Sequence, residues 1–235
     1  MIELEKYRKE YIGNVSHELK TPIFNLQGYL QTLINGGLHD ESVNMKFLNK
    51  AMSNAERLQI IVEDLEAISR LESKEYETEF REFDIKILSQ EVIDDLSSKA
   101  HEKNIRLVYK SEEEKPMVVV GDREQIRLVL TNLVQNGIKY GIINGFVKIR
   151  TYDVDSKVLI EVADNGIGIP EESLLKVFDR FYRADKSRSR EMGGSGLGLS
   201  IVKHIVEHHK QSILVRSKKG EGSVFSFTLE SFKAY

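Results

Sequence analysis

Hydrophobic residues in the first 71 positions recur at steps of three and four, which is the period of an amphipathic α-helix. One series beginning at Ile12 runs through Val15, Leu19, Ile23, Leu26, Leu30 and Leu33. A second series runs through Phe47, Ala51, Ala55, Leu58, Val62, Leu65, Ile68 and Leu71. Gly36-Gly37 separates the two, and Asp40 or Ser42 can cap the second helix. The pattern predicts two long helices joined by a short loop, which is an antiparallel hairpin.

The two apolar stripes are too extensive for a lone hairpin to bury. Pairing two hairpins into a four-helix bundle buries both stripes, so the sequence predicts a homodimer. The alternative is that the hairpin packs against the rest of its own chain. Stripes of this length, spaced as in a coiled coil, favour a helical partner.

After the polar stretch 69–79, which we interpret as the end of the helix and a hinge, the pattern changes. Short β-like runs occupy 80–85, 105–110, 117–120, 146–152, 158–163, 213–217 and 223–229. Helical patterns intervene at 85–103, 123–139 and 198–209. The chain is therefore expected to be an α+β protein, with a helical hairpin over residues 1–75 and an α/β sandwich over 76–235.

Composition narrows the function classes. The 235 residues carry a net charge of −3 with charges spread throughout, which gives no general electrostatic case for nucleic acid or membrane binding. There is no cysteine, so disulfides and thiolate metal sites are excluded. No apolar run reaches the roughly 20 residues of a membrane helix. His204 and His208 have the spacing of a metal pair, but nothing completes a site, so these two and His209 are predicted to be surface histidines.

The segment SHELKTP, residues 16–22, places His17 on the exposed side of the first helix, with Thr21 one turn further on the same face. A lone exposed histidine is ordinarily a solvated surface residue. Here Glu18 can orient the imidazole or take its proton, and a neutral imidazole is a nucleophile. Pro22 bends or loosens the helix within a turn of His17. These neighbours indicate a reactive histidine, with a tolerated kink as the alternative.

Two glycine-rich runs predict a nucleotide site, although no GxxxxGK[ST] P-loop is present. DNGIGIP, residues 164–170, follows an apolar strand. Gly166 and Gly168 permit close approach to a flat ligand, and Asp164 can accept a hydrogen bond from an adenine amino group. Alone, Asp-Asn-Gly is also simple turn chemistry. The second run leads directly into a helix, where glycine-rich backbone makes an anion site, and contains Gly194, Gly196, Leu197 and Gly198.

Basic residues lie between the two glycine runs: Arg180, Arg183, Lys186, Arg188 and Arg190. A basic segment that ends in glycines is typical of a lid over phosphates, and a solvated loop is the alternative. Upstream, Asn132, Asn136 and Lys139 share one helix face. Asparagine oxygens can ligate Mg²⁺ and a lysine can contact phosphate. Two asparagines alone would be surface residues, but beside two glycine runs and a basic segment they indicate a nucleotide site.

Together these motifs resemble the transmitter core of bacterial sensor histidine kinases across nearly the whole chain. SHELKTP is similar to the phosphoacceptor box of that family and NLVQNGIKYG to its asparagine box. DNGIGIP, FDRFYR and GGSGLGLSIV resemble the first glycine box, the phenylalanine box and the second glycine box. The resemblance implies a dimerising hairpin followed by an ATP-binding sandwich of the type found in gyrase and the heat-shock chaperone.

The resemblance also implies roles. Asn136 would coordinate Mg²⁺, Asp164 would read adenine, and Tyr140 would line the ATP pocket. Lys139, Arg180 and Arg183 would contact phosphates, with Phe181 in the phenylalanine box between the two arginines. His17 would pass its phosphoryl group to an aspartate on the receiver domain of a response regulator, and Thr21 would orient water for a phosphatase reaction. Phe24 lies near the His17 face and is either a contact for that partner or an edge residue of the bundle.

Two other functions compete. The gyrase-type ATPases carry a water-activating glutamate where this chain has Asn132, which argues against an ATPase. A nucleotide-sensing scaffold would need no SHELKTP box. Gly137 stands where the family usually has alanine, which should weaken its helix by about 1 kcal/mol. By resemblance we expect the cytoplasmic portion of a sensor kinase, connected to a membrane only through an N-terminal sensor region that would precede Met1.

Overall fold

The computed structural model describes residues 2–73, 79–111, 115–184 and 194–232. Two compact units result. Of the described residues, 2–69 with 194–197 form the first, and 70–73, 79–111, 115–184 and 198–232 form the second. Within the stretch 69–79, predicted as the helix end and a hinge, residues 74–78 lie outside the described residues. Within the described part of the chain, no helix combines the length and apolar content needed to cross a lipid bilayer.

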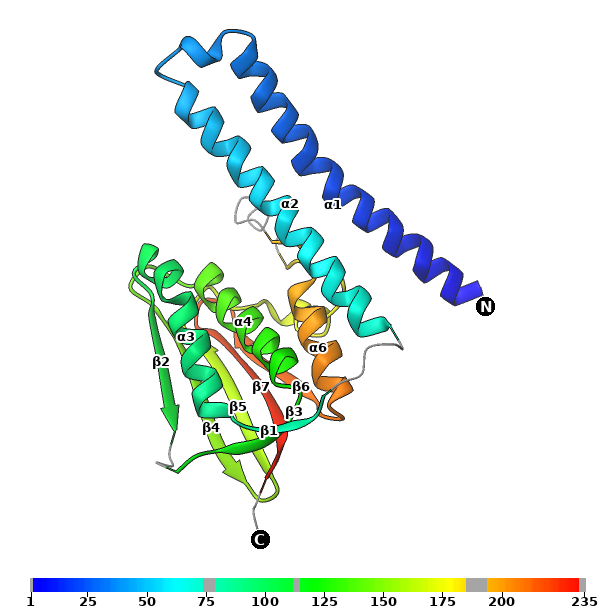
Figure 1. Ribbon diagram of the computed structural model, residues 1–235, viewed down its shortest axis with the longest axis vertical. Coiled ribbons are helices and arrows are strands. Elements are labelled where there is room, and N and C mark those ends of the chain that lie inside the picture. Colours follow the sequence, from blue (N-terminus) through cyan, green and yellow to red (C-terminus); the bar gives the residue numbers. More distant parts are fainter. Residues whose placement is uncertain (1, 74–78, 112–114, 185–193, 233–235) are drawn as a thin grey trace. The chain divides into compact units, whose positions relative to one another are not determined.

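The predicted hairpin is present. Helix α1 spans Ile2–Ile34 and helix α2 spans Asn44–Glu72, with a short 3₁₀ turn, η1, at Gly37–His39 between them (Figure 1). Gly36 ends α1 with φ +116°, a conformation that favours glycine. The Asp40 carboxylate accepts hydrogen bonds from the backbone N–H and the hydroxyl of Ser42, and these bonds lower the Asp40 pKa. The two predicted caps therefore fold the turn that precedes α2.

The predicted apolar stripes are only partly buried within the single hairpin. Leu33, Ala51 and Ile68 are buried as predicted. Ile23, Leu30 and Val62 were placed on the same stripes but remain 39%, 42% and 47% exposed. Ile61 is fully buried in place of its neighbour Val62. One pair of helices offers each stripe a single neighbour, so part of each stripe stays in contact with solvent.

The second unit contains one mixed seven-stranded sheet. Its strands are β1 Arg81–Asp84, β2 Arg106–Ser111, β3 Val118–Gly121, β4 Phe146–Val154, β5 Lys157–Asp164, β6 Ile213–Lys218 and β7 Gly222–Ser231. The order is β1-β3-β7-β5-β4-β2, with β6 also paired to β7. Only β2 and β4 pair in parallel among these strands. Every predicted strand is present to within a few residues.

Three helices cover one face of this sheet: α3 Ile85–Glu102, α4 Arg123–Tyr140 and α6 Gly198–His208 (Figure 1). Their inward faces are fully buried, with Leu88, Ile126, Leu133 and Ile201 among the residues that exclude solvent. The facing strands alternate, so that Ile149, Ile160 and Phe227 point into the same layer. The result is the predicted two-layer α/β sandwich, with the polar motifs at the ends of its helices and strands.

Candidate active site

His17 is exposed on α1, as the helix phase predicts. The Thr21 hydroxyl donates to the His17 backbone carbonyl at 3.2 Å, a local bond of the kind that often bends a helix, just before Pro22. α1 continues through Pro22, whose ring is buried. Phe24 is 64% exposed in the single chain.

Glu18 has a partner that the local sequence does not reveal. Its carboxylate accepts a hydrogen bond from the Arg57 guanidinium of α2 at 3.0 Å, and the two side chains keep 18% and 10% of their exposure. Charge-assisted bonds in such surroundings are strong and directional. The pair therefore fixes the carboxylate that follows His17 and ties α1 to α2.

Asn132 lies on α4 beside the start of α6. Its side-chain amide donates to the Leu128 carbonyl at 3.0 Å, which fixes which way the group points. A Cβ on Gly198 would lie 2.5 Å from the Asn132 Oδ1 atom. Glycine at the first residue of α6 is thus what allows the helix N-terminus to approach Asn132.

Asn136, Lys139 and Tyr140 continue the same helix and are all half-buried. The Lys139 Nζ lies 5.1 Å from the centre of the Tyr140 ring, within cation–π range. α4 itself is capped by Asp122, which accepts from the N–H groups of Glu124 and Gln125. The helix is therefore well anchored at the end opposite to these residues.

Asp164 ends β5 and accepts a hydrogen bond from the Gly166 N–H at 2.8 Å. Burial raises the Asp164 pKa, and hydrogen bonds from Gly166 and Ser223 oppose that shift. A Cβ on Gly166 would lie 2.4 Å from the Tyr140 carbonyl oxygen, and the Ile167 N–H donates to that oxygen at 3.1 Å. The DNG turn is therefore held directly against the end of α4.

Gly168 and Gly222 join the same turn to the β6–β7 connection. Gly168 has φ +66°, and a Cβ there would lie 2.0 Å from the Lys218 carbonyl oxygen. Gly222 has φ +108°, and a Cβ there would lie 2.1 Å from the Asp164 carbonyl oxygen. The Gly220 N–H donates to the Ile167 carbonyl at 2.8 Å. The DNG turn, the β6–β7 connection and the end of α4 thus meet with almost no space between their backbones.

The phenylalanine-box segment packs on the second unit through aromatic residues. Phe178 meets Phe225 of β7 edge to face at 6.3 Å, and the Tyr182 hydroxyl donates to Ser173 at 3.0 Å. Phe181 has φ +61°, a left-handed conformation that costs energy for a bulky residue. Arg180 and Arg183 on either side are half-buried.

The second glycine run leads into α6, as predicted. Gly196 has φ +77°, Leu197 is fully buried, and the Leu197 N–H donates to the Ser195 hydroxyl at 3.1 Å. Gly194 is half-buried. The basic residues Lys186, Arg188 and Arg190 lie outside the described residues.

His209 corrects one prediction, because it is not a surface histidine. Its Nδ1–H donates to the Ile205 carbonyl at 2.8 Å, and its Nε2 accepts from the Asp122 N–H at 3.0 Å. Phe80 packs on the ring at 4.9 Å, and burial lowers the His209 pKa. Its spacing of four from the buried Ile205 is the sequence signal that could have indicated this position.

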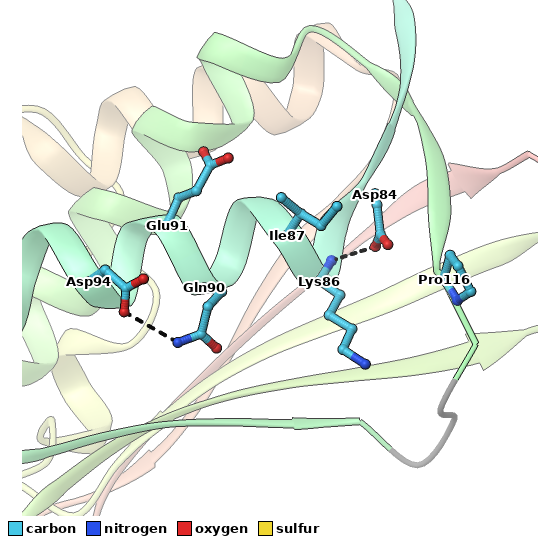
Figure 2. Close-up of a pocket in the computed structure, with 7 residues that line it drawn as sticks. All are labelled: Asp84, Lys86, Ile87, Gln90, Glu91, Asp94 and Pro116. Carbon is cyan, nitrogen blue, oxygen red and sulfur yellow. Dashed lines mark hydrogen bonds between the residues drawn. The ribbon is translucent and has the colours of Figure 1, made fainter.

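A surface depression elsewhere in the second unit involves none of the predicted nucleotide residues. It is lined by Asp84, Lys86, Ile87, Gln90, Glu91, Asp94 and Pro116 (Figure 2). Its carboxylates are already engaged: Asp84 caps α3, Asp94 accepts from Gln90, and Glu91 pairs with Arg123 and Arg127 of α4. These contacts cap α3 and join α3 to α4, so the carboxylates of the depression serve the fold.

A magnesium ion bound together with a nucleotide fits the residues of α4. Within the described residues, no group of three or more histidines and carboxylates could hold a metal ion by itself. Asn136, half-buried and one turn from Asn132, offers a neutral amide oxygen instead. Mg²⁺ keeps phosphates and waters as most of its ligands and needs few protein oxygens, so such a residue suits it.

Two family models match the chain. The His Kinase A (phospho-acceptor) domain matches residues 7–74, and the histidine kinase-, DNA gyrase B-, and HSP90-like ATPase matches residues 121–232. The chain is 35% identical over 231 residues to the sensor histidine kinase WalK of Bacillus subtilis, covering 97% of this chain and 37% of that protein. It is 33% identical over 230 residues to a sensor protein kinase WalK of Staphylococcus aureus, covering 97% and 54%. The chain thus spans about a third to a half of these relatives.

Solved structures agree. The catalytic domain of histidine kinase ThkA is 35% identical, with a TM-score of 0.57 over 65% of this chain and 95% of that one. ThkA in complex with the response regulator protein TrrA is 31% identical, with a TM-score of 0.79 over 98% and 64%. Acinetobacter baumannii histidine kinase AdeS is 28% identical, with a TM-score of 0.70 over 92% and 98%.

Proposed function

Because this chain belongs to the histidine kinase family, with a phosphoacceptor domain and an ATPase-type domain, we propose that it uses ATP to phosphorylate its own His17. The phosphoryl group then passes to an aspartate on the receiver domain of a response regulator. We also propose a domain boundary after residue 75, which the end of the phospho-acceptor match at residue 74 supports. Since ATP is the substrate, these residues would work in the cytoplasm.

The proposed ATP site is the cluster at the end of α4. Asp164 accepts a hydrogen bond from the adenine amino group, and Gly166 and Gly168 leave room for the flat base. Tyr140 lines the pocket, with Lys139 over its ring at 5.1 Å. Lys139, Arg180 and Arg183 neutralise phosphate charge, and Phe181 supports the segment that carries the two arginines. Gly194, Gly196, Leu197 and Gly198 bring backbone N–H groups to the phosphates at the start of α6.

Asn136 would hold Mg²⁺, which supplies charge neutralisation at the phosphates when it is bound. Asn132 beside it is an amide, with its Nδ2 donating to the Leu128 carbonyl. An amide is not a base and cannot activate water for attack on the γ-phosphate. The residue therefore favours transfer to a protein group over ATP hydrolysis.

In the transfer step, a ring nitrogen of His17 attacks the γ-phosphorus. The nitrogen–phosphorus bond forms as the bond from phosphorus to the bridging oxygen of ADP breaks. The imidazole proton passes to the Glu18 carboxylate, which the Arg57 guanidinium holds at 3.0 Å. Positioning and charge neutralisation supply most of the catalysis in such reactions.

We infer a homodimer from the hairpin. Ile23, Leu30 and Val62 lie on the predicted stripes and are 39–47% exposed in the single chain. A second hairpin would bury them, and Leu30→Glu should therefore give monomers in sedimentation experiments. The exposed Phe24, about two turns beyond His17, would contact the response regulator, and Thr21 would orient water for dephosphorylation of that partner.

The observation that carries the kinase proposal is the approach of Gly198 to Asn132, because it joins the second glycine box to the asparagine box. The test is incubation of the full chain with γ-labelled ATP. Acid-labile and alkali-stable label should appear in the wild type and be lost in His17→Gln. His39→Gln, a second exposed histidine of the hairpin, is the matched control and should keep the label.

Four results would separate the alternatives. Label retained in His17→Gln would refute phosphorylation at this residue. Release of free phosphate without protein label would favour an ATPase, and ADP binding with neither product would favour a nucleotide-sensing scaffold. Normal labelling of Asn136→Asp or Gly196→Ala would show that the nucleotide site is assigned wrongly.

A further inference from the structure

The last turn of α4 carries Lys139 and Tyr140, yet its carbonyl groups have no partners within the helix. The residue that follows, Gly141, is extended, with φ −64° and ψ +157°. No left-handed glycine cap therefore closes the helix. Since this turn belongs to the proposed ATP site, the contacts that hold it in place bear on nucleotide binding.

Lys103 provides such a contact from the end of α3. Its Nζ donates to the Lys139 carbonyl at 2.9 Å and to the Ile138 carbonyl at 3.3 Å. A cation at a helix C-terminus interacts favourably with the helix dipole as well as with the unpaired carbonyls. The ammonium group of α3 thus caps a helix that begins 20 residues later.

The turn at the end of α3 directs Lys103 to this place. Asn104 adopts φ +53°, and the Ile105 N–H returns to the Ala100 carbonyl at 2.9 Å, which closes α3. Ile105 then lies close to Gly141: a Cβ added to Gly141 would be 2.6 Å from the Ile105 Cδ1 atom. Lys103 and Ile105 therefore contact successive parts of the same α4 terminus.

The other side of that terminus contacts the DNG turn, where the Ile167 N–H donates to the Tyr140 carbonyl at 3.1 Å. The carbonyls of residues 138, 139 and 140 are thus divided between Lys103 and Ile167. A shift of the α4 terminus would move Lys139, Tyr140 and the DNG turn together. The two parts of the proposed adenine pocket, the α4 residues and the DNG turn, therefore both depend on the position of the α4 terminus.

We propose that Lys103 is a positioning residue for nucleotide binding, acting through the carbonyls of the α4 terminus. This inference rests on the proposed function, since the ligand is taken to be an adenine nucleotide. The competing view is that Lys103 is an exposed lysine that adds stability to the fold and nothing to the site. The two views differ in whether the affinity of correctly folded protein changes.

The experiment measures ADP binding to the full chain by titration calorimetry, with Lys103→Met, Lys103→Arg and Lys99→Met as variants. Methionine keeps most of the side-chain length and removes the charge. Lys99 lies one turn earlier on α3 and is also exposed, so it controls for the loss of a positive charge. A helix-terminal charge is worth up to about 2 kcal/mol, so Lys103→Met should raise the ADP dissociation constant roughly 3- to 30-fold.

The expected pattern is weaker binding at unchanged stoichiometry in Lys103→Met, near-normal binding in Lys103→Arg, and no change in Lys99→Met. In the kinase assay, the KM for ATP should rise while the labelling rate at saturating ATP stays near normal. A lower melting temperature with unchanged affinity would overturn the inference, as would equal weakening in Lys99→Met. If the wild type bound no ADP, the proposed function itself would fail, which is a separate result.

Discussion

Replacing Gly168 by alanine should destabilise the second unit far more than the same change at Gly220. Both glycines have positive φ, +66° and +87°, and both belong to the contact between the DNG turn and the β6–β7 connection. A Cβ at Gly168 would lie 2.0 Å from the Lys218 carbonyl oxygen, whereas nothing lies within 4 Å of one at Gly220. The pair therefore separates backbone strain from steric overlap.

The magnitudes follow from these distances. A left-handed conformation costs an alanine about 1–2 kcal/mol, and this applies to both variants. Overlap in a well-packed region adds about 1–3 kcal/mol, at the upper end here because the atom displaced is backbone. Gly168→Ala should thus lose roughly 3–5 kcal/mol and Gly220→Ala roughly 1–2 kcal/mol. Displacement of Lys218 would also break the bond from Gly220 to the Ile167 carbonyl, and ADP affinity should fall with it.

Urea unfolding followed by circular dichroism measures the two free energies, and calorimetry measures ADP binding under the same conditions. At roughly 2–4 °C per kcal/mol for a unit of this size, Gly168→Ala should melt several degrees below Gly220→Ala. Losses that agree within about 0.5 kcal/mol would refute the reasoning, because the overlap would then contribute nothing.

Three further changes test other contacts. Arg57→Met should lower the free energy of unfolding in urea by about 2 kcal/mol, because the largely buried Glu18 carboxylate loses this partner. The same change should slow phosphoryl labelling of His17. Gly137→Ala should gain about 1 kcal/mol of helix propensity, but its new Cβ would lie 2.7 Å from Val147 Cγ2. Val147→Ala should relieve this overlap. Urea unfolding of the two single variants and the double variant should therefore show a favourable coupling energy of about 1–2 kcal/mol. Burial lowers the pKa of His209, so near pH 6.5 the unfolded chain binds a proton that the folded chain does not bind. The free energy of unfolding should therefore be retained above pH 6.5 and decline below it, by up to about 1.4 kcal/mol per pH unit. His209→Gln should reduce that slope.

Each of these has a contradicting outcome. Unchanged stability and labelling in Arg57→Met would show that the ion pair does not hold Glu18. Additive effects in the Gly137 cycle would show that Val147 does not limit that position. An unaltered slope between pH 7.5 and 5.5 in His209→Gln would assign the pH dependence to other groups.

Most of the secondary structure was predictable because its signals are local. Period-3.6 stripes predicted α1 and α2, and alternating apolar runs predicted the seven strands. The two-residue turn at Asp155-Ser156 between β4 and β5 falls between the predicted runs 146–152 and 158–163. The family could be identified in the same way, since five short motifs resemble its sequence boxes and two of its domain models match the chain.

The predictions failed where a residue depends on a distant neighbour. His209 reads as polar in the sequence, yet the N–H of Asp122 and the ring of Phe80 give it a buried place. The sequence also did not reveal why glycine stands at position 137, where a Cβ would lie 2.7 Å from Val147 Cγ2. Ile61 was left off the predicted apolar stripe of α2, yet it is fully buried.

The sequence by itself determined the helices, the strands and the candidate chemistry, because hydrophobic period, glycine and proline act within a few residues. Tertiary structure alone decided which backbones touch at Gly168, which cation meets Glu18, and that Lys103 caps a helix it does not belong to. The physical reason is that hydrogen bonding and steric exclusion act over about 3 Å in space. Lys103 and Ile138 are 35 residues apart along the chain, and that separation does not indicate that they lie within hydrogen-bonding distance.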